Sequence, residues 1–162
     1  GPPVPRVRES EGHDVDAKVV FGWWRDVRAG LLEALGSLSE EQLDFRPREG
    51  LWSIREVIVH IAGTEDGWLR HYTDNRWHEA PPEPADYPTK ASLVDLLARE
   101  HELTEAQFGE DPEALMARVC KLPWGGEVPM GWAVWHVLEH EIHHRGEVYL
   151  MLGLLGMEAP DV

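Results

Sequence analysis

The sequence predicts an all-α protein: a four-helix bundle with a long crossover between the second and the third helix. Two observations lead to this prediction. Four long segments repeat apolar residues at the spacing of a helix face, and no segment alternates convincingly as a strand does. A proline-rich stretch without periodicity, residues 75–88, separates the second segment from the third. The bundle is expected over residues 14–156, between a disordered N-terminal arm (1–13) and a C-terminal tail (157–162).

Capping signals set the boundaries of the first two helices. The first is expected over residues 14–38. Ser53 and Glu56 have the spacing of a capping box, in which each side chain bonds the backbone N–H of the other residue. The second helix is therefore expected to begin near Ser53 and to run to about Tyr72. The sequence Ser-Glu-Glu-Gln at residues 39–42 is a second box, for a short turn between these helices.

Similar signals define the second half of the chain. Thr89 is the expected N-cap of the third helix, and the Asp-Pro pair at 111–112 predicts a short additional helix. Glycines at 125–126 interrupt the chain again. The last helix is expected to begin near residues 129–131, without a capping side chain, and to continue to about Leu152.

Composition excludes several classes of function. The 162 residues include 30 acids against 15 Lys and Arg, for a net charge of −15, which repels nucleic acid and anionic lipid. No apolar stretch is long enough to span a bilayer. Cys120 is the single cysteine, which excludes an internal disulfide and a multi-cysteine zinc site, and it is expected to be inert packing. These features predict a cytoplasmic protein that binds neither nucleic acid nor a membrane.

Four histidines lie close together in the last helix. At about 100° per residue, His136, His140 and His144 share one stripe, whereas His143 lies off its edge. Side chains four residues apart are roughly 5 to 6 Å apart at Cβ, so His140 and His144 can share one cation. His60 is the natural third ligand, because it lies on a stripe of the second helix with small neighbours. Three histidines leave coordination positions open for water or substrate, as in catalytic sites.

The remaining histidines have an ordinary interpretation. A lone histidine on a helix is usually a surface residue or a core residue with satisfied hydrogen bonds. We expect this for His13, His71, His78 and His101.

A metalloprotease is an alternative, because His140-Glu-Ile-His-His144 satisfies the HExxH pattern of zinc proteases, in which the glutamate is the general base. The metzincin extension of that pattern needs glycine at 147 and histidine at 150, but Glu147 and Leu150 stand there. No sheet is visible that would hold a peptide in extended form. Glu141 also points toward the edge of the histidine stripe rather than its centre.

Two motifs carry a family resemblance. Trp52-Ser-Ile-Arg-Glu-Val-Ile-Val-His60-Ile-Ala-Gly-Thr-Glu and Trp132-Ala-Val-Trp-His-Val-Leu-Glu-His140-Glu-Ile-His-His144-Arg-Gly-Glu147 resemble the DinB/YfiT-like metalloenzymes. The resemblance covers about residues 14–156. It implies a four-helix bundle, frequent homodimers and one divalent ion, nickel or zinc first and iron or copper next, held by His60, His140 and His144.

The resemblance also implies a chemistry. Characterised relatives include mycothiol-dependent maleylpyruvate isomerases and S-transferases that use a low-molecular-weight thiol. A bound divalent ion lowers the pKa of a thiol and so produces a thiolate near neutral pH. Glu147 or Glu56 is then expected to act as a base, or to orient an imidazole. The alternative from another class is a non-catalytic metal-binding or stress-response protein.

Overall fold

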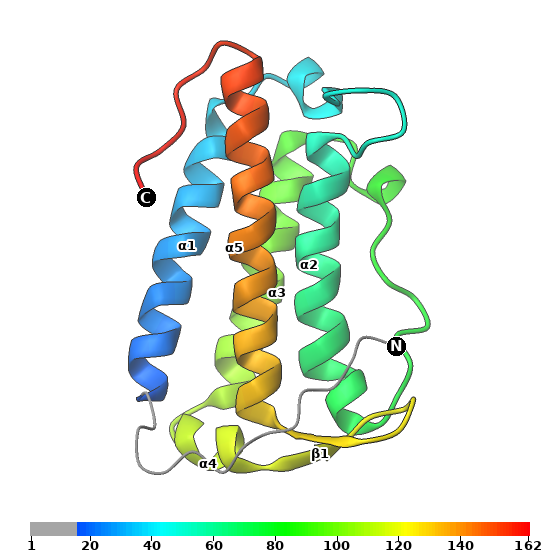
Figure 1. Ribbon diagram of the computed structural model, residues 1–162, viewed down its shortest axis with the longest axis vertical. Helices are drawn as coiled ribbons and strands as arrows, with labels where there is room; N and C mark the ends of the chain where they lie inside the picture. The colour runs from blue at the N-terminus through cyan, green and yellow to red at the C-terminus, as the bar shows by residue number, and fades with distance from the viewer. Residues whose placement is uncertain (1–15) are drawn as a thin grey trace.

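The computed structural model describes residues 16–162, and four long helices lie side by side along its long axis (Figure 1). The helices are α1 (Ala17–Ser37), α2 (Ile54–Arg70), α3 (Lys90–Phe108) and α5 (Met130–Leu154). The helices α2 and α3 run in the same direction, opposite to α1 and α5, so the segment between α2 and α3 crosses the whole length of the bundle (Figure 1). The predicted four-helix bundle with a long crossover is therefore confirmed. The expected arm over residues 1–13 lies outside the described residues.

Short elements connect the long helices. The 3₁₀ turns are η1 (Glu41–Asp44), η2 (Tyr72–Asp74) and η3 (Pro84–Asp86), and α4 (Pro112–Ala117) is the expected short helix. The strands β1 (Val119–Lys121) and β2 (Glu127–Pro129) form an antiparallel hairpin at one end of the bundle. The expectation that no strand forms was therefore wrong. Three residues per strand are too few to show alternation, and Gly125 and Gly126, with φ of 100° and 89°, allow the tight turn.

The predicted capping boxes are present. The Ser53 hydroxyl accepts a hydrogen bond from the backbone N–H of Glu56, whose carboxylate accepts one from the N–H of Ser53. Thr89 caps α3 through a similar exchange with Ser92. The helix α5 follows Pro129 and has no capping side chain, as expected. Capping satisfies backbone donors that have no partner inside the helix, which explains why short sequence signals located these ends well.

The core consists of two apolar clusters, one in each half of the bundle, with charged residues between them. The cluster beside η1 includes Leu31, Ile58 and Leu97, and the cluster beside the hairpin includes Trp24, Leu69 and Val134. The C-terminal tail contributes Met157 and Ala159 to the first cluster. Within residues 16–162, no helix combines the length and apolar composition that a membrane span requires.

Buried charges lie at mid-height in the bundle. Arg28 of α1 is 3% exposed, Glu65 of α2 is 0% exposed and Glu141 of α5 is 1% exposed. The Arg28 Nη2 atom lies 2.6 Å from a Glu65 oxygen and 2.7 Å from a Glu141 oxygen. One cation therefore joins three helices, and an ionic contact of this kind is stable in the interior only because its partners are also hydrogen-bonded.

Candidate metal centre

The structure brings together the three histidines that the sequence singled out. His60 on α2 faces His140 and His144 on α5, and the Nε2 atoms of His60 and His140 are 2.8 Å apart. One ring nitrogen from each of the three lies within 4.8 Å of the other two. The packing of α2 against α5 therefore brings three potential nitrogen ligands from distant parts of the chain to one point.

The surroundings keep two of these imidazoles unprotonated. Burial, together with the neighbouring imidazoles of His144 and His60, lowers the pKa of His140 to about 3. Burial, and then the proximity of His144, also lowers the pKa of His60, against the opposing effect of Glu147. A neutral imidazole has a free electron pair on one nitrogen, which is the form that binds a metal. The donor set thus fits a divalent cation.

Glu147 contacts one of the three histidines. Its Oε2 lies 3.1 Å from Nδ1 of His144, which leaves Nε2 of His144 free to face the centre. Its Oε1 lies 3.2 Å from Nε2 of His143, an exposed residue outside the three-histidine set. A carboxylate bound to the far nitrogen of a metal-binding histidine fixes the tautomer and the ring orientation. This position agrees with one of the two roles expected for Glu147.

Glu56 has different partners. Its carboxylate accepts hydrogen bonds from Arg46 Nη2 at 2.6 Å and from the backbone of Ser53. Burial opposes a lowered pKa, but these bonds and the charge of Arg46 still lower the pKa of Glu56. The residue thus begins α2 and ion-pairs with the preceding loop. These contacts favour a structural role over the expected role as a base.

The glutamate of the HExxH string points away from the histidines and into the core. Glu141 accepts hydrogen bonds from Trp24 Nε1 at 3.0 Å and from Arg28 Nε at 2.9 Å and Nη2 at 2.7 Å. A general base needs a free carboxylate within reach of a water or substrate proton. Glu141 cannot reach such a proton, because its side chain is buried in the core and both of its oxygens bond to Arg28 or Trp24. The geometry therefore gives no support to the protease alternative.

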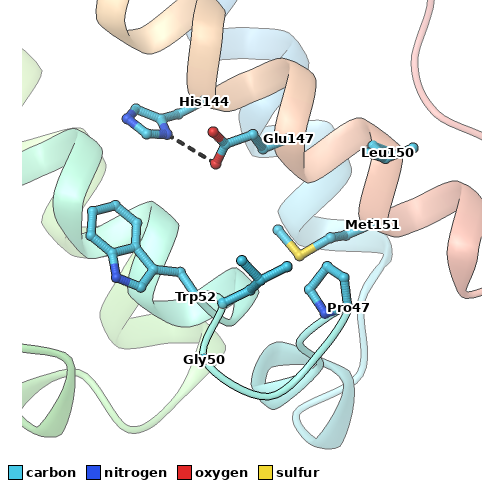
Figure 2. A pocket seen from close by; sticks show the side chains of 8 residues that line it. Pro47, Gly50, Trp52, His144, Glu147, Leu150 and Met151 are labelled. Atoms are coloured by element: carbon cyan, nitrogen blue, oxygen red, sulfur yellow. Dashed lines mark hydrogen bonds and ion pairs between the residues drawn. The ribbon is translucent and has the colours of Figure 1, made fainter.

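Cavities lie on both sides of the three histidines. Figure 2 shows the larger one, about 460 Å³, in which His144 and Glu147 of α5 lie opposite the loop that contains Gly50 and Trp52. Its other lining residues are Pro47, Leu51, Leu150 and Met151. A smaller cavity of about 240 Å³ reaches His60 and Thr64 from the side of the crossover. A small molecule bound in either cavity would therefore touch one of the candidate ligands.

Two contacts at the centre were not predicted. The Trp52 ring lies 4.6 Å from the His60 ring and 6.0 Å from the His144 ring, between centroids. Thr64 Oγ1 lies 3.3 Å from His140 Nε2. No local signal in the sequence indicates that Trp52 contacts histidines of two helices, because the contact depends on how α2 and α5 pack.

Two further candidate residues, His136 and Cys120, have packing roles in the structure. His136 stacks on Trp132, with ring centroids 4.9 Å apart and planes 7° apart, and it is not one of the grouped donors. Burial raises the pKa of the Cys120 thiol, although Arg118 opposes the shift. A raised thiol pKa disfavours the nucleophilic thiolate. This agrees with the expectation that Cys120 is packing.

Fold and site together define a class of protein: a four-helix bundle with a three-histidine centre between two of its helices. Comparison with known families makes this assignment specific. The DinB superfamily model matches residues 24–148, and the chain belongs to the DinB superfamily.

Individual relatives are distant. A curated relative from Bacillus mycoides (strain KBAB4), named a "putative metal-dependent hydrolase", is 24% identical over 73% of this chain and 77% of its own length. The crystal structure of a DinB-like protein from Bacillus cereus matches with a TM-score of 0.70 at 17% identity, over 90% of this chain and 97% of that one. A mycothiol-dependent maleylpyruvate isomerase matches with a TM-score of 0.63 at 16% identity, over 84% of this chain and 62% of that one.

Proposed function

We propose that His60, His140 and His144 bind one divalent metal ion, nickel or zinc before iron or copper, and that the centre is catalytic. The observation that carries this proposal is the convergence of three ring nitrogens at one point between two cavities. The lowered pKa values of His140 and His60 support it, because a lowered pKa favours the neutral imidazole that binds a metal. The name of the Bacillus mycoides relative, which includes the words metal-dependent, also supports it.

We further propose that the reaction joins a low-molecular-weight thiol to a small electrophile, or uses the thiol to isomerise it. When bound, the ion supplies Lewis acidity that lowers the pKa of a thiol. The residues of this chain orient the reactants and move the proton. Glu147 lines the larger cavity beside His144, and we assign it the proton that the thiol loses as sulfur bonds to the electrophilic carbon. That proton then passes to the product or to the leaving group.

The cavity limits the electrophile. Its lining is mostly apolar, from Pro47, Leu51, Leu150 and Met151, and His144 and Glu147 are the polar side chains in its wall. A volume of about 460 Å³ is within the range of pockets for small organic molecules, which is roughly 300 to 1,000 Å³. A compact, partly apolar electrophile fits this space better than an extended peptide. The similarity to a thiol-dependent isomerase favours a thiol as the second reactant.

The metal claim is tested first. Protein treated with a chelator is titrated with Ni²⁺ or Zn²⁺, and the bound metal is measured for wild type, His60→Ala, His140→Ala and His144→Ala. His143→Ala is the matched control, because this histidine is exposed and lies on the same helix. We expect each of the three variants to lose the ion of this centre, and the control to keep it. Unchanged metal content in His140→Ala would refute the proposal.

The reaction is tested on the metal-loaded protein. A panel of electrophiles is incubated with mycothiol, bacillithiol or glutathione, and conjugates and isomers are measured by mass spectrometry. We expect turnover that depends on both thiol and metal and that falls in Glu147→Gln. Metal-dependent hydrolysis of esters or amides without thiol would favour a hydrolase, which the name of the Bacillus mycoides relative suggests. Metal binding without any turnover would favour the non-catalytic alternative.

We also propose a homodimer formed through the face shared by α1 and α5. Val19 and Trp23 of α1 are 41% and 50% exposed, and Trp135 and Ile142 of α5 are 39% and 44% exposed. Trp23 and Trp135 pack edge to face, with ring centroids 6.2 Å apart. Contiguous exposed aromatic side chains are typical of protein interfaces. Sedimentation of wild type and Trp23→Lys tests this: we expect a dimer that the variant dissociates, and a monomeric wild type would contradict it.

A further inference from the structure

A second group of potential metal ligands lies at the end of α2, apart from the three-histidine centre. Asp66 lies in the last turns of α2, His71 caps its C-terminus and His78 lies in the crossover. Between the two histidines the chain makes the turn η2 and reverses at Asn75, which has a φ of 57°. This reversal brings the imidazole of His78 onto that of His71, with ring centroids 4.5 Å apart and planes tilted by 30°.

In both imidazoles Nε2 lies close to the same carboxylate oxygen. Nε2 of His78 lies 3.0 Å from Oδ2 of Asp66, and Nε2 of His71 lies 3.3 Å from the same atom. All three donor atoms lie within 4.8 Å of one another. Metal–nitrogen and metal–oxygen bonds of about 2.0 to 2.2 Å place neighbouring ligand atoms roughly 3 to 3.5 Å apart. The two Asp66 distances match this spacing.

The geometry at His78 argues against a simple network of hydrogen bonds. Its side chain is 6% exposed, and among residues 16–162 its Nε2 makes no hydrogen bond of good geometry, although Oδ2 of Asp66 is only 3.0 Å away. The N–H direction therefore misses the carboxylate. A buried polar atom without a partner costs about 1 to 3 kcal/mol, so such atoms need an explanation. An ion between His78, His71 and Asp66 would use the free nitrogen.

The neighbouring residues favour this arrangement. A Cβ atom at Gly67 would lie 2.9 Å from Nδ1 of His78, so glycine at this position leaves room for the ring. The other oxygen of Asp66, Oδ1, accepts a hydrogen bond from Arg70 Nε at 2.7 Å. This bond fixes the carboxylate and leaves Oδ2 facing the two histidines, as an orienting partner does in known metal sites.

We propose that Asp66, His71 and His78 bind a second divalent transition-metal ion, of which Zn²⁺ is the probe of choice. Two imidazoles and one carboxylate are ligands that zinc and similar ions accept. The ion would tie the first part of the crossover to the end of α2. His78 also lines the 240 Å³ cavity together with His60 and Thr64, so the second ion would hold one wall of the cavity that reaches the first centre. The proposal does not depend on the activity of that centre.

The test counts zinc ions. Full-length protein treated with a chelator is titrated with Zn²⁺ by calorimetry, and the metal retained after desalting is measured. We expect two equivalents in wild type, one in His71→Gln/His78→Gln and one in His60→Ala/His140→Ala. His143→Gln is the matched control and should keep two, which also excludes a site built from His143, His144 and Glu147. Equal zinc content in wild type and His71→Gln/His78→Gln would overturn the proposal. A failure of the first centre alone would instead leave one equivalent in wild type, which His60→Ala/His140→Ala keeps and His71→Gln/His78→Gln loses.

A second measurement keeps the test valid if a variant fails to fold. Circular dichroism first establishes that each variant is helical, and if the double variant is unfolded, His71→Gln alone replaces it, because this side chain is 26% exposed. In the His60→Ala/His140→Ala background, added Zn²⁺ should raise Tm, since an ion that binds only the folded state stabilises it. That rise should disappear when His71→Gln is added. A rise that persists would refute the second site. Metal binding at the first centre is tested separately, with the variant His71→Gln/His78→Gln.

Discussion

Glu141→Gln separates a structural role of the HExxH glutamate from a catalytic one. In the structure the Glu141 carboxylate accepts three hydrogen bonds, one from Trp24 and two from Arg28. A glutamine at this position keeps one oxygen acceptor, but its amide group presents N–H donors to the donors of Arg28. The change leaves the backbone and the three candidate ligands in place. It removes one of the two negative charges that surround a buried cation.

The size of the stability loss depends on the partners that Arg28 keeps in Glu141→Gln. Breaking a buried ion pair by removing one partner costs about 3 to 5 kcal/mol when the other charge is left alone. Arg28 is not left alone, because Glu65 lies 2.6 Å from its Nη2 and Leu97 accepts a hydrogen bond from its Nη1 at 2.7 Å. We therefore expect a loss of about 2 to 3 kcal/mol in the free energy of unfolding. For a chain of this length that corresponds to about 2 to 4 °C in Tm per kcal/mol.

Urea unfolding and metal content are measured on the same samples. Glu139→Gln is the matched control, since Glu139 is exposed, lies two residues away on α5 and carries the same charge. We expect the control to unfold as wild type does, and Glu141→Gln to unfold at lower urea while it retains the ion of the three-histidine centre. The reasoning would be refuted by Glu141→Gln with wild-type stability, and above all by wild-type stability combined with lost activity. That outcome would return Glu141 to the role of a catalytic base.

Three further changes test other parts of the structure. Glu147→Gln should weaken metal binding by about 10- to 100-fold, measured by competition with a chromophoric chelator; unchanged affinity would exclude an orienting role. Ser53→Ala should cost about 1 kcal/mol in urea unfolding through the lost capping box, and an unchanged transition would contradict it. Burial alone would raise the pKa of Glu65, but Arg28 and hydrogen bonds lower it from 4.5 to about 2. That shift stabilises the fold by about 3 kcal/mol above the unfolded pKa, and the contribution is lost as pH falls toward 2. The stability difference between wild type and Glu65→Gln should therefore shrink on acidification, and a difference that is constant with pH would contradict this.

Local patterns predicted the features that depend on one helix at a time. The spacing of His140 and His144 follows from the helical repeat, so their shared face is fixed as soon as α5 is a helix. The capping residues Ser53 and Thr89 act on donors only three residues away, and both were located from the sequence. His60 was a harder case, because its meeting with α5 depends on packing. His60 was predicted as a ligand because it lies on a helix stripe whose other residues are small enough to leave room beside it.

The unpredicted side-chain contacts depend on how the chain folds back or how its helices pack. Arg28 and Glu141 are 113 positions apart, and nothing near either residue indicates its partner. His78 lies in an aperiodic stretch, and it approaches Asp66 only because the chain reverses at Asn75. The expectation that His71 and His78 are ordinary surface or core residues came from their isolation in the sequence. The close approach of both rings to one carboxylate oxygen is a tertiary contact, which no spacing rule describes.

The HExxH string shows how packing decides the meaning of a sequence motif. Along α5, His140 and His144 face α2, whereas Glu141, about 100° further round the helix, faces α1 and its Arg28. A helix between two partners must satisfy both faces, so adjacent residues of one motif meet different chemistry. In this bundle the histidines meet a third histidine and the glutamate meets a buried cation. The motif of two ligands and a base is therefore, in this bundle, two candidate ligands and an ion pair, and the carboxylate that faces the larger cavity is Glu147.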